Sequence, residues 1–268
     1  MLSDLHIGLF ATGRGQGSYL LVQAIHQAIQ AGRLKAKILF VFSNREPEEF
    51  GPTDTFFAMV RGLGYPLITH SFRKFKARFG NGPTWRDEYY REVMAKLAGH
   101  TPDISVLAGY LHIFSPEMCA RYPAINLHPA APGGPIGMWQ QVIWQLIASK
   151  ATASGNTIFY VTEEMDKGPT VTYSTFSLHG PLFDAHWKAI EGRPVADLEK
   201  SPGEELPLFK VIREEGAVRE RPLVVETLRA FADGRVRLQK GAVLDAQGRP
   251  VKGIDLTAEI EAGLGTQS

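Results

Sequence analysis

The sequence has little cysteine, no long apolar run and no stretch of charge of one sign. Cys119 is its only cysteine in 268 residues, which excludes an intramolecular disulfide and a cysteine-based zinc cluster and is typical of a reducing compartment. The 29 basic residues balance 28 acidic ones, so nothing indicates nucleic acid or an anionic membrane as a partner. Residues 1–18 lack the basic segment of a signal peptide and break into glycines too early for a membrane span. We therefore expect a cytoplasmic protein that acts on a small molecule.

What the sequence does contain is an alternation of short apolar segments with segments of helical periodicity. Residues 37–42 (KILFVF) are apolar almost throughout, as in a strand buried on both faces. In residues 17–31, apolar side chains recur at the spacing of one helix face, and Gly32 marks the end. This alternation predicts an α/β fold with a Rossmann-like, mostly parallel twisted sheet flanked by helices. The strands and helices expected in the first part are residues 6–11, 17–31, 37–42, 53–63, 66–69, 84–97 and 104–108.

The second part continues with further strands and two longer helices. Residues 178–205 are rich in Gly, Pro and charge, and we expect an inserted surface loop with room for a short helix. We expect a single domain over residues 1–268, with a phosphate-binding lobe at about 1–105 and a catalytic lobe at about 106–268. Its ligand site should lie at the carboxyl ends of the strands. The expected elements are strands at 124–127, 156–162 and 170–176, helices at 138–149 and 206–232, and a closing strand pair around 236–243 and 250–254.

A glycine-rich turn, TGRGQGS (residues 12–18), separates the first strand from the first helix. Free N–H groups at a helix start bind anions such as phosphate, and Arg14 adds a positive charge. A tight turn alone would also use glycines, and the segment matches neither the dinucleotide fingerprint nor the P-loop. No acidic residue ends the second strand, which argues against an NAD-dependent dehydrogenase. Arg86 is a second candidate phosphate partner, although a lone helix arginine is commonly a solvated surface residue.

Polar side chains with catalytic potential follow in two later segments. Asn126 and His128 (INLHP) point to the same side of an extended chain, where an amide and an imidazole together could stabilise an oxyanion. A structural, hydrogen-bonded pair is the alternative. Asp166 precedes a Gly-Pro corner and by itself indicates a turn, but beside a histidine it would relay protons. Glu220, taken alone, is a solvated helix carboxylate.

Taken in order, seven segments resemble the glycinamide ribonucleotide formyltransferases, a family of folate-dependent formyltransferases. The likeness runs over about residues 5–250. The segments are the glycine turn, VFSN (41–44), WRDEYYREV (85–93), VLAGYLHIFSP (106–116), INLHP (125–129), VTEEMDKGP (161–169) and ERPLVVETLRAFADGRV (220–236).

The resemblance implies a reaction and assigns its residues. An amine attacks the formyl carbon of 10-formyltetrahydrofolate, Asn126 and protonated His128 stabilise the oxygen of the tetrahedral intermediate, and Asp166 holds His128 and helps to move the proton. Neither a metal nor a covalent nucleophile is required, and the chain would act as a monomer or homodimer. The folate would contact Leu111, His112, Ile113, Phe114, Val161, Thr162, Glu163, Glu164, Met165 and Asp166. The phosphorylated amine would contact Gly15, Gln16, Gly17, Ser18, Tyr19, Arg86 and Glu220.

The chain departs from the family pattern around the amine. Tyr19 replaces the usual Asn of the glycine turn, and residues 130–141 (AAPGGPIGMWQQ) replace the usual Ser-Leu-Leu-Pro segment and a downstream His. Tyr19 and Trp139 would reshape a ribonucleotide site, so another amine, such as an amino sugar or a specialised metabolite, is an alternative acceptor. A deformylase, in which water replaces the amine, normally carries an additional N-terminal domain of about 80 residues that we do not find here. A non-catalytic nucleotide-binding module would leave Asn126, His128 and Asp166 unexplained.

Overall fold

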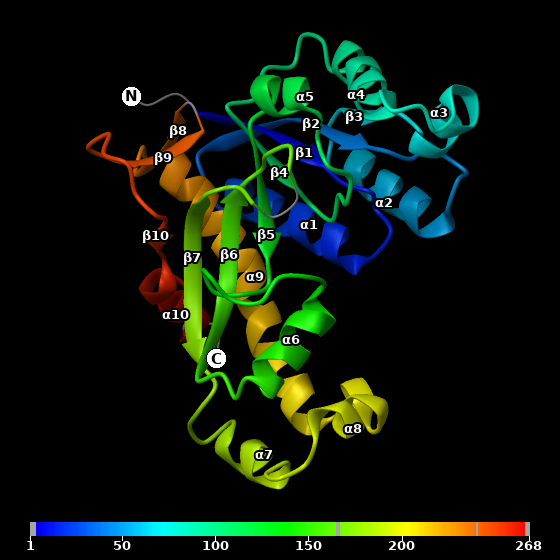
Figure 1. The fold of residues 1–268 in the computed structure, drawn as a ribbon. Coiled ribbons are helices and arrows are strands. Elements are labelled where there is room, and N and C mark those ends of the chain that lie inside the picture. The colour runs from blue at the N-terminus through cyan, green and yellow to red at the C-terminus, as the bar shows by residue number, and fades with distance from the viewer. Residues whose placement is uncertain (1–3, 165–166, 240, 266–268) are drawn as a thin grey trace.

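An eight-stranded sheet with helices on both faces forms the centre of the computed structural model (Figure 1), which describes residues 4–164, 167–239 and 241–265. The strand order is β10-β7-β6-β5-β4-β1-β2-β3. The strands are β1 (Leu5–Phe10), β2 (Ala36–Ser43), β3 (Leu67–Thr69), β4 (Ile104–Leu107), β5 (Ala124–His128), β6 (Ala153–Tyr160), β7 (Thr170–Ser177) and β10 (Ile254–Asp255). The helices are α1 (Gln16–Gln30), α2 (Gly51–Gly62), α3 (Phe72–Phe79), α4 (Trp85–Lys96), α5 (Pro116–Arg121), α6 (Trp139–Ala148), α7 (Asp184–Ala189), α8 (Val195–Lys200), α9 (Pro207–Ala232) and α10 (Thr257–Gly265).

Most neighbouring strands of this sheet run parallel, which confirms the predicted fold class. Strands β3, β2, β1, β4 and β5 are mutually parallel, and only β6 runs antiparallel to its neighbours β5 and β7. The chain leaves β1 in one direction to form β2 and β3 and then returns to add β4 on the other side of β1. In open α/β sheets, ligands bind outside the carboxyl ends of the strands at such a reversal. The first expected ligand position is therefore the edge where β1 and β4 end.

Alternating side chains of the parallel strands divide the interior into two layers. Ile7 and Leu9 of β1 face α1, α2 and α9, whereas Phe10 faces α3, α4 and α5 with the aromatic side chains of β2. A third cluster lies away from the parallel strands, where Trp144 of α6 packs against Phe209 of α9 with ring centroids 4.9 Å apart. Because both faces of the central strands are buried, their sequences are nearly continuous in apolar residues.

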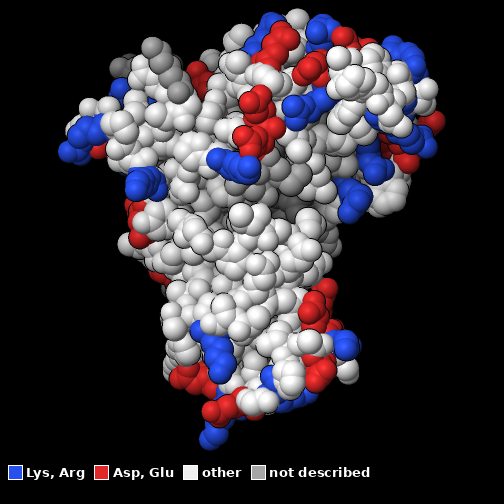
Figure 2. Space-filling view, in the orientation of Figure 1, with Lys and Arg blue, Asp and Glu red and all other residues white. Residues whose placement is uncertain are grey.

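The structure corrects the prediction for residues 178–205. This segment forms α7, α8 and a 3-10 turn (Gly203–Glu205). The side chains of Leu178, Phe183 and Leu198 are buried in the third cluster. It is an additional small layer against α6 and α9, visible at the lower end of the molecule in Figure 1. In the same orientation, Figure 2 shows charged side chains at this end and at the opposite end, with a mostly uncharged surface between them. The helices are only 6 residues long, too short to show a periodicity in the sequence.

Smaller differences concern α3 and the end of the chain. Helix α3 was not expected; its first turn is capped by Ser71, which accepts from the Lys74 amide at 3.0 Å. The predicted closing pair is a tight hairpin, β8 (Val236–Gln239) with β9 (Ala242–Asp245), whereas β10 joins the large sheet beside β7. Across the described ranges, no helix is long and apolar enough to cross a membrane.

Candidate active site

A cavity of about 530 Å³ opens at the carboxyl ends of β4 and β5, beside the loop that joins β6 to β7. Asn126 and His128 both line it. The backbone of Asn126 is paired with Leu107 of β4 on one side and with Phe159 of β6 on the other. The two polar side chains therefore project from the middle of a sheet whose strands fix their position.

His128 is held by the loop that follows β5. The residue is 7% exposed, its ring stacks on Phe159 with centroids 5.5 Å apart, and its Nε2 lies 2.9 Å from the backbone oxygen of Pro135. A carbonyl oxygen only accepts hydrogen bonds, so Nε2 carries the proton in this contact. Among the described residues Nδ1 has no hydrogen-bond partner, so it can accept a proton or, in the imidazolium, donate one.

The predicted folate residues divide between the cavity wall and the interior. Leu111, His112, Ile113, Val161, Thr162 and Glu164 line the cavity. Phe114 does not: its side chain is fully buried and packs against Phe10 and Tyr90. Met165 and Asp166 lie outside the described residues, so the third member of the proposed catalytic trio stays a prediction.

The loop between β6 and β7 closes one wall of the cavity and depends on a glycine. A Cβ at Gly168 would lie 1.6 Å from the backbone oxygen of Tyr160, so no other residue fits there without moving the strand end. Glu163 is exposed, and its backbone oxygen accepts a hydrogen bond of 3.4 Å from Arg86 of α4. Arg86 thus contacts the predicted folate segment.

His112 lines the cavity, and its surroundings favour the neutral form of its ring. Its ring packs at 4.3 Å from that of Phe72 and at 5.6 Å from that of Tyr110. Burial lowers the pKa of His112. This residue therefore contributes a polar, uncharged ring to the wall.

The predicted amine-binding residues lie at the start of α1, on α4 and on α9. Ser18 is buried against Gly109, whose φ of +71° and the close Ser18 Oγ both exclude a larger residue. Tyr19 is partly buried and packs against the core on the α1 face. Glu220 forms an ion pair of 2.5 Å with Arg213 on α9. Among the described residues, none of Gly15, Gln16, Gly17, Tyr19, Arg86 and Glu220 belongs to the lining of the cavities found at the carboxyl edge.

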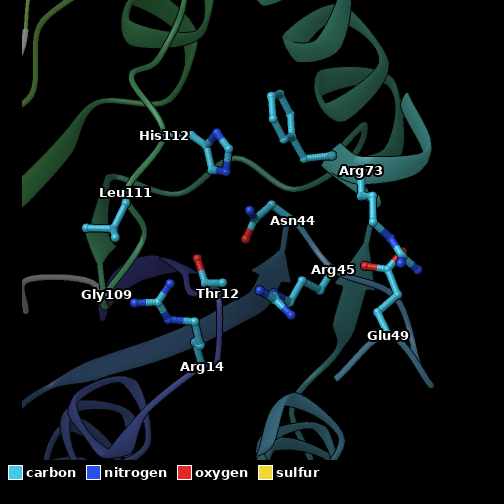
Figure 3. A pocket seen from close by; sticks show the side chains of 10 residues that line it. Thr12, Arg14, Asn44, Arg45, Glu49, Arg73, Gly109, Leu111 and His112 are labelled. Atoms are coloured by element: carbon cyan, nitrogen blue, oxygen red, sulfur yellow. The ribbon is translucent and has the colours of Figure 1, made fainter. Parts of the chain in front are cut away.

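Sequence reasoning missed a second cavity of about 340 Å³ at the same edge (Figure 3). Its wall includes Asn44 and Arg45, which directly follow β2, and Arg73 from the start of α3. It also includes Arg14 of the glycine turn, and it shares Leu111 and His112 with the first cavity. The position of Asn44 and Arg45 after a predicted strand was the available signal, because such residues gather at one sheet edge.

The sheet is covered by helices on both faces and has two adjoining cavities at its carboxyl edge, one of which contains the Asn–His pair. This arrangement is typical of an enzyme that acts on a small molecule. Residues 10–178 match the formyl transferase family model. The chain belongs to the formyl transferase family and is a formyl-transferring enzyme. The sequence is 26% identical to a phosphoribosylglycinamide formyltransferase of Escherichia coli over 242 residues, 89% of this chain and 94% of that one. It is 30% identical to the enzyme of the same name from Schizosaccharomyces pombe over 166 residues, 59% of this chain and 76% of that one.

Solved structures with a similar fold include proteins of the same name as these sequence relatives. A solved phosphoribosylglycinamide formyltransferase from Coxiella burnetii superimposes with a TM-score of 0.63 at 22% identity, covering 94% of this chain and 99% of that one. At this identity the likeness establishes the fold.

Proposed function

We propose that the chain transfers the formyl group of 10-formyltetrahydrofolate to the primary amine of glycinamide ribonucleotide, a step of purine biosynthesis. The observation that carries the proposal is the pairing of Asn126 and His128 at the wall of the larger cavity, in a chain of the formyl transferase family. The names of the curated relatives support glycinamide ribonucleotide as the acceptor.

The larger cavity fits a folate. Its volume of about 530 Å³ lies in the range of small-molecule sites, and most of its wall is apolar, with polar groups at few positions. Leu111, His112 and Ile113 would hold the ring system from one side, and Val161 and Thr162 from the other. When bound there, the folate supplies the formyl group that is transferred. In this proposal the catalytic lobe consists of residues 106–268 with the larger cavity. The phosphate-binding lobe consists of residues 1–105.

Asn126 and His128 act on the charge that develops at the formyl oxygen. The Asn126 amide is an N–H donor fixed by a strand with neighbours on both sides, so its position costs no reorganisation during the reaction. His128 offers a second donor once protonated, because Nε2 is engaged by the Pro135 oxygen while Nδ1 has no hydrogen-bond partner among the described residues. Asp166 is assigned to hold the imidazolium and to move the proton that the amine loses.

A different amine acceptor is the second candidate. Three large apolar side chains at or beside the cavity mouth are exposed: Leu111 by 65%, Ile136 by 69% and Met138 by 56%. Trp139 adds an aromatic wall, with the Arg213 guanidinium 4.9 Å from its ring centroid. An acceptor with an apolar body would cover these side chains, which a ribonucleotide would leave in water.

The deciding experiment incubates the purified chain with 10-formyltetrahydrofolate and glycinamide ribonucleotide and follows the formylated amide by mass spectrometry. Formation of formylglycinamide ribonucleotide that stops in Asn126→Ala supports the proposal. Formyl transfer to other amines without turnover of glycinamide ribonucleotide would replace the acceptor, and formate released at the same rate without any amine would identify a hydrolase.

A further inference from the structure

The imidazole of His128 is oriented by a main-chain oxygen of the loop that follows its strand. Its Nε2 lies 2.9 Å from the Pro135 oxygen, in the loop of residues 129–138 between β5 and α6. Because a carbonyl only accepts, this contact selects the ring form with the proton on Nε2 and leaves Nδ1 to the reaction. The loop is not part of the sheet, so the position of this oxygen depends on the other contacts that hold the loop.

Thr157 holds the beginning of the loop. It lies on β6, directly opposite His128 in the antiparallel pairing of β5 and β6. Its hydroxyl donates to the Ala130 oxygen at 2.7 Å, and the residue is only 2% exposed. Because water does not reach this place to replace a lost donor, Thr157 fixes the point at which the chain leaves β5.

Gln145 holds the loop on the other side of Pro135. Its Nε2 donates at 3.2 Å to the oxygen of Ile136, the residue that follows Pro135 directly. The helix that carries Gln145 is anchored, since Trp144 and Leu146 on either side of it are buried in the third cluster. Gln145 itself is exposed, and among the described residues its side chain makes this one hydrogen bond. The fold therefore does not need the side chain of Gln145 for packing.

These two contacts enclose the oxygen that orients the ring. Between them, the Gly134 amide donates to the Ala131 oxygen at 2.9 Å and closes a turn. All three bonds end on main-chain oxygens, so the loop is held as a unit through its backbone. Loss of the anchor at Ala130 or at Ile136 would therefore release the Pro135 oxygen from His128.

We propose that Gln145 and Thr157 are positioning residues for formyl transfer. By holding the loop of residues 129–138, they keep the Pro135 oxygen on Nε2 of His128 and leave Nδ1 available for the proton. Within the described part of the chain neither residue lines the larger cavity, so each acts through the loop and not on the reacting atoms. The inference rests on the role of His128 in the proposed function.

Paired substitutions of opposite chemistry test each position. Gln145→Lys keeps a donor for the Ile136 oxygen, whereas Gln145→Glu turns an acceptor toward it. Thr157→Ser keeps the hydroxyl, whereas Thr157→Val removes it. With glycinamide ribonucleotide and 10-formyltetrahydrofolate, kcat should fall about tenfold or more in Gln145→Glu and Thr157→Val and stay within about threefold of the wild type in the two conservative variants. Both KM values should change little, because the lining of the larger cavity is unaltered.

Gln140→Glu and Thr172→Val are the matched controls. Gln140 lies on the same helix, and the described residues record no hydrogen bond of its side chain, so this variant adds the same charge without removing a bond to the loop. Thr172 is a buried strand threonine whose hydroxyl pairs with that of Thr227 at 2.6 Å. Thr172→Val should lower Tm and leave kcat unchanged. Equal falls of kcat in Thr157→Val and Thr172→Val would overturn the positioning role.

Heteronuclear NMR of the ring nitrogens follows His128 without any substrate, with its signals assigned from their loss in His128→Gln. At about pH 9, above the range in which histidine titrates, the ring should carry its proton on Nε2. Gln145→Glu and Thr157→Val should move the nitrogen shifts toward a mixture of both tautomers, whereas Gln145→Lys and Thr157→Ser should keep them. Unchanged shifts in Gln145→Glu and Thr157→Val would overturn the inference, whatever their kcat. The expected shifts in a chain that does not formylate glycinamide ribonucleotide would refute the proposed acceptor and leave the positioning role standing.

Discussion

Replacing Asn126 by alanine tests the central assignment, because the structure separates the chemical role of this side chain from its structural one. Within the described residues the Asn126 amide makes no hydrogen bond, and the residue is only half-buried at the cavity wall. Its backbone pairing with Leu107 and Phe159 does not depend on the side chain. The substitution should therefore leave Tm close to that of the wild type.

The expected loss is in catalysis. Removing one preorganised donor to a developing oxyanion lowers kcat by about 10²–10³, or about 2.7–4 kcal/mol of transition-state stabilisation. Single-turnover formyl transfer at saturating folate and amine measures this step directly, and a folate-binding titration of the variant shows whether the ground state is altered. KM should change little, since the interaction strengthens only in the transition state.

Asn156 provides the matched control. Its buried Nδ2 donates to the Gly216 carbonyl of α9 at 2.9 Å, away from the larger cavity. Asn156→Ala should cost about 1 kcal/mol of stability, lowering Tm by about 2–4 °C, and keep kcat. If Asn126→Ala kept a near-normal kcat, or lost activity only in proportion to a fall in Tm like that of Asn156→Ala, the oxyanion role would be refuted.

Three further predictions concern the walls and the interior. Gly168→Ala should abolish folate binding by driving the loop off the Tyr160 carbonyl, whereas Gly62→Ala, where a Cβ meets nothing within 4 Å, should bind normally in a fluorescence titration. Burial lowers the pKa of His70, so the neutral form is favoured in the folded state; stability should be complete above about pH 6.5 and fall as the pH drops below it. Melting curves from pH 7.5 to 5 should show this fall, and His70→Gln should reduce it; an unchanged slope would contradict the assignment. Burial raises the pKa of the Cys119 thiol to about 11, so iodoacetamide at pH 7.5 should label the folded chain far more slowly than the urea-unfolded chain, and equal rates would contradict this.

The central sheet could be predicted because its strands carry their signal locally. Ile104 to Leu107 and Phe40 to Phe42 are buried on both faces, so an uninterrupted apolar run suffices to find them. Helices α7 and α8 had no such signal. They are held by a few buried side chains, such as Phe183 and Leu198, whose partners on α6 and α9 are distant in sequence. Propensity and periodicity do not record such contacts.

The candidate site was predictable to the extent that its residues share a strand or a motif. Asn126 and His128 are two residues apart, and alternation alone places them together. Arg45 and Arg73 reach one cavity from a strand end and a helix start that are far apart in sequence, and only the sheet order brings them beside Arg14. Helix α3 was not predicted within residues 70–79. Arg73 near its start was therefore not predicted as a site residue.

The unusual loop after His128 changes its side chains without removing the support that the imidazole needs. The contact to Nε2 comes from the backbone oxygen of Pro135, and any residue type supplies a carbonyl at that position. A second backbone contact fixes the same loop: the Thr157 hydroxyl on β6 donates to the Ala130 oxygen at 2.7 Å. Because both contacts use main-chain oxygens, a change of side chains in residues 130–141 leaves the orientation of His128 intact. The loop can therefore vary in sequence while β5 and the imidazole at its end keep their position.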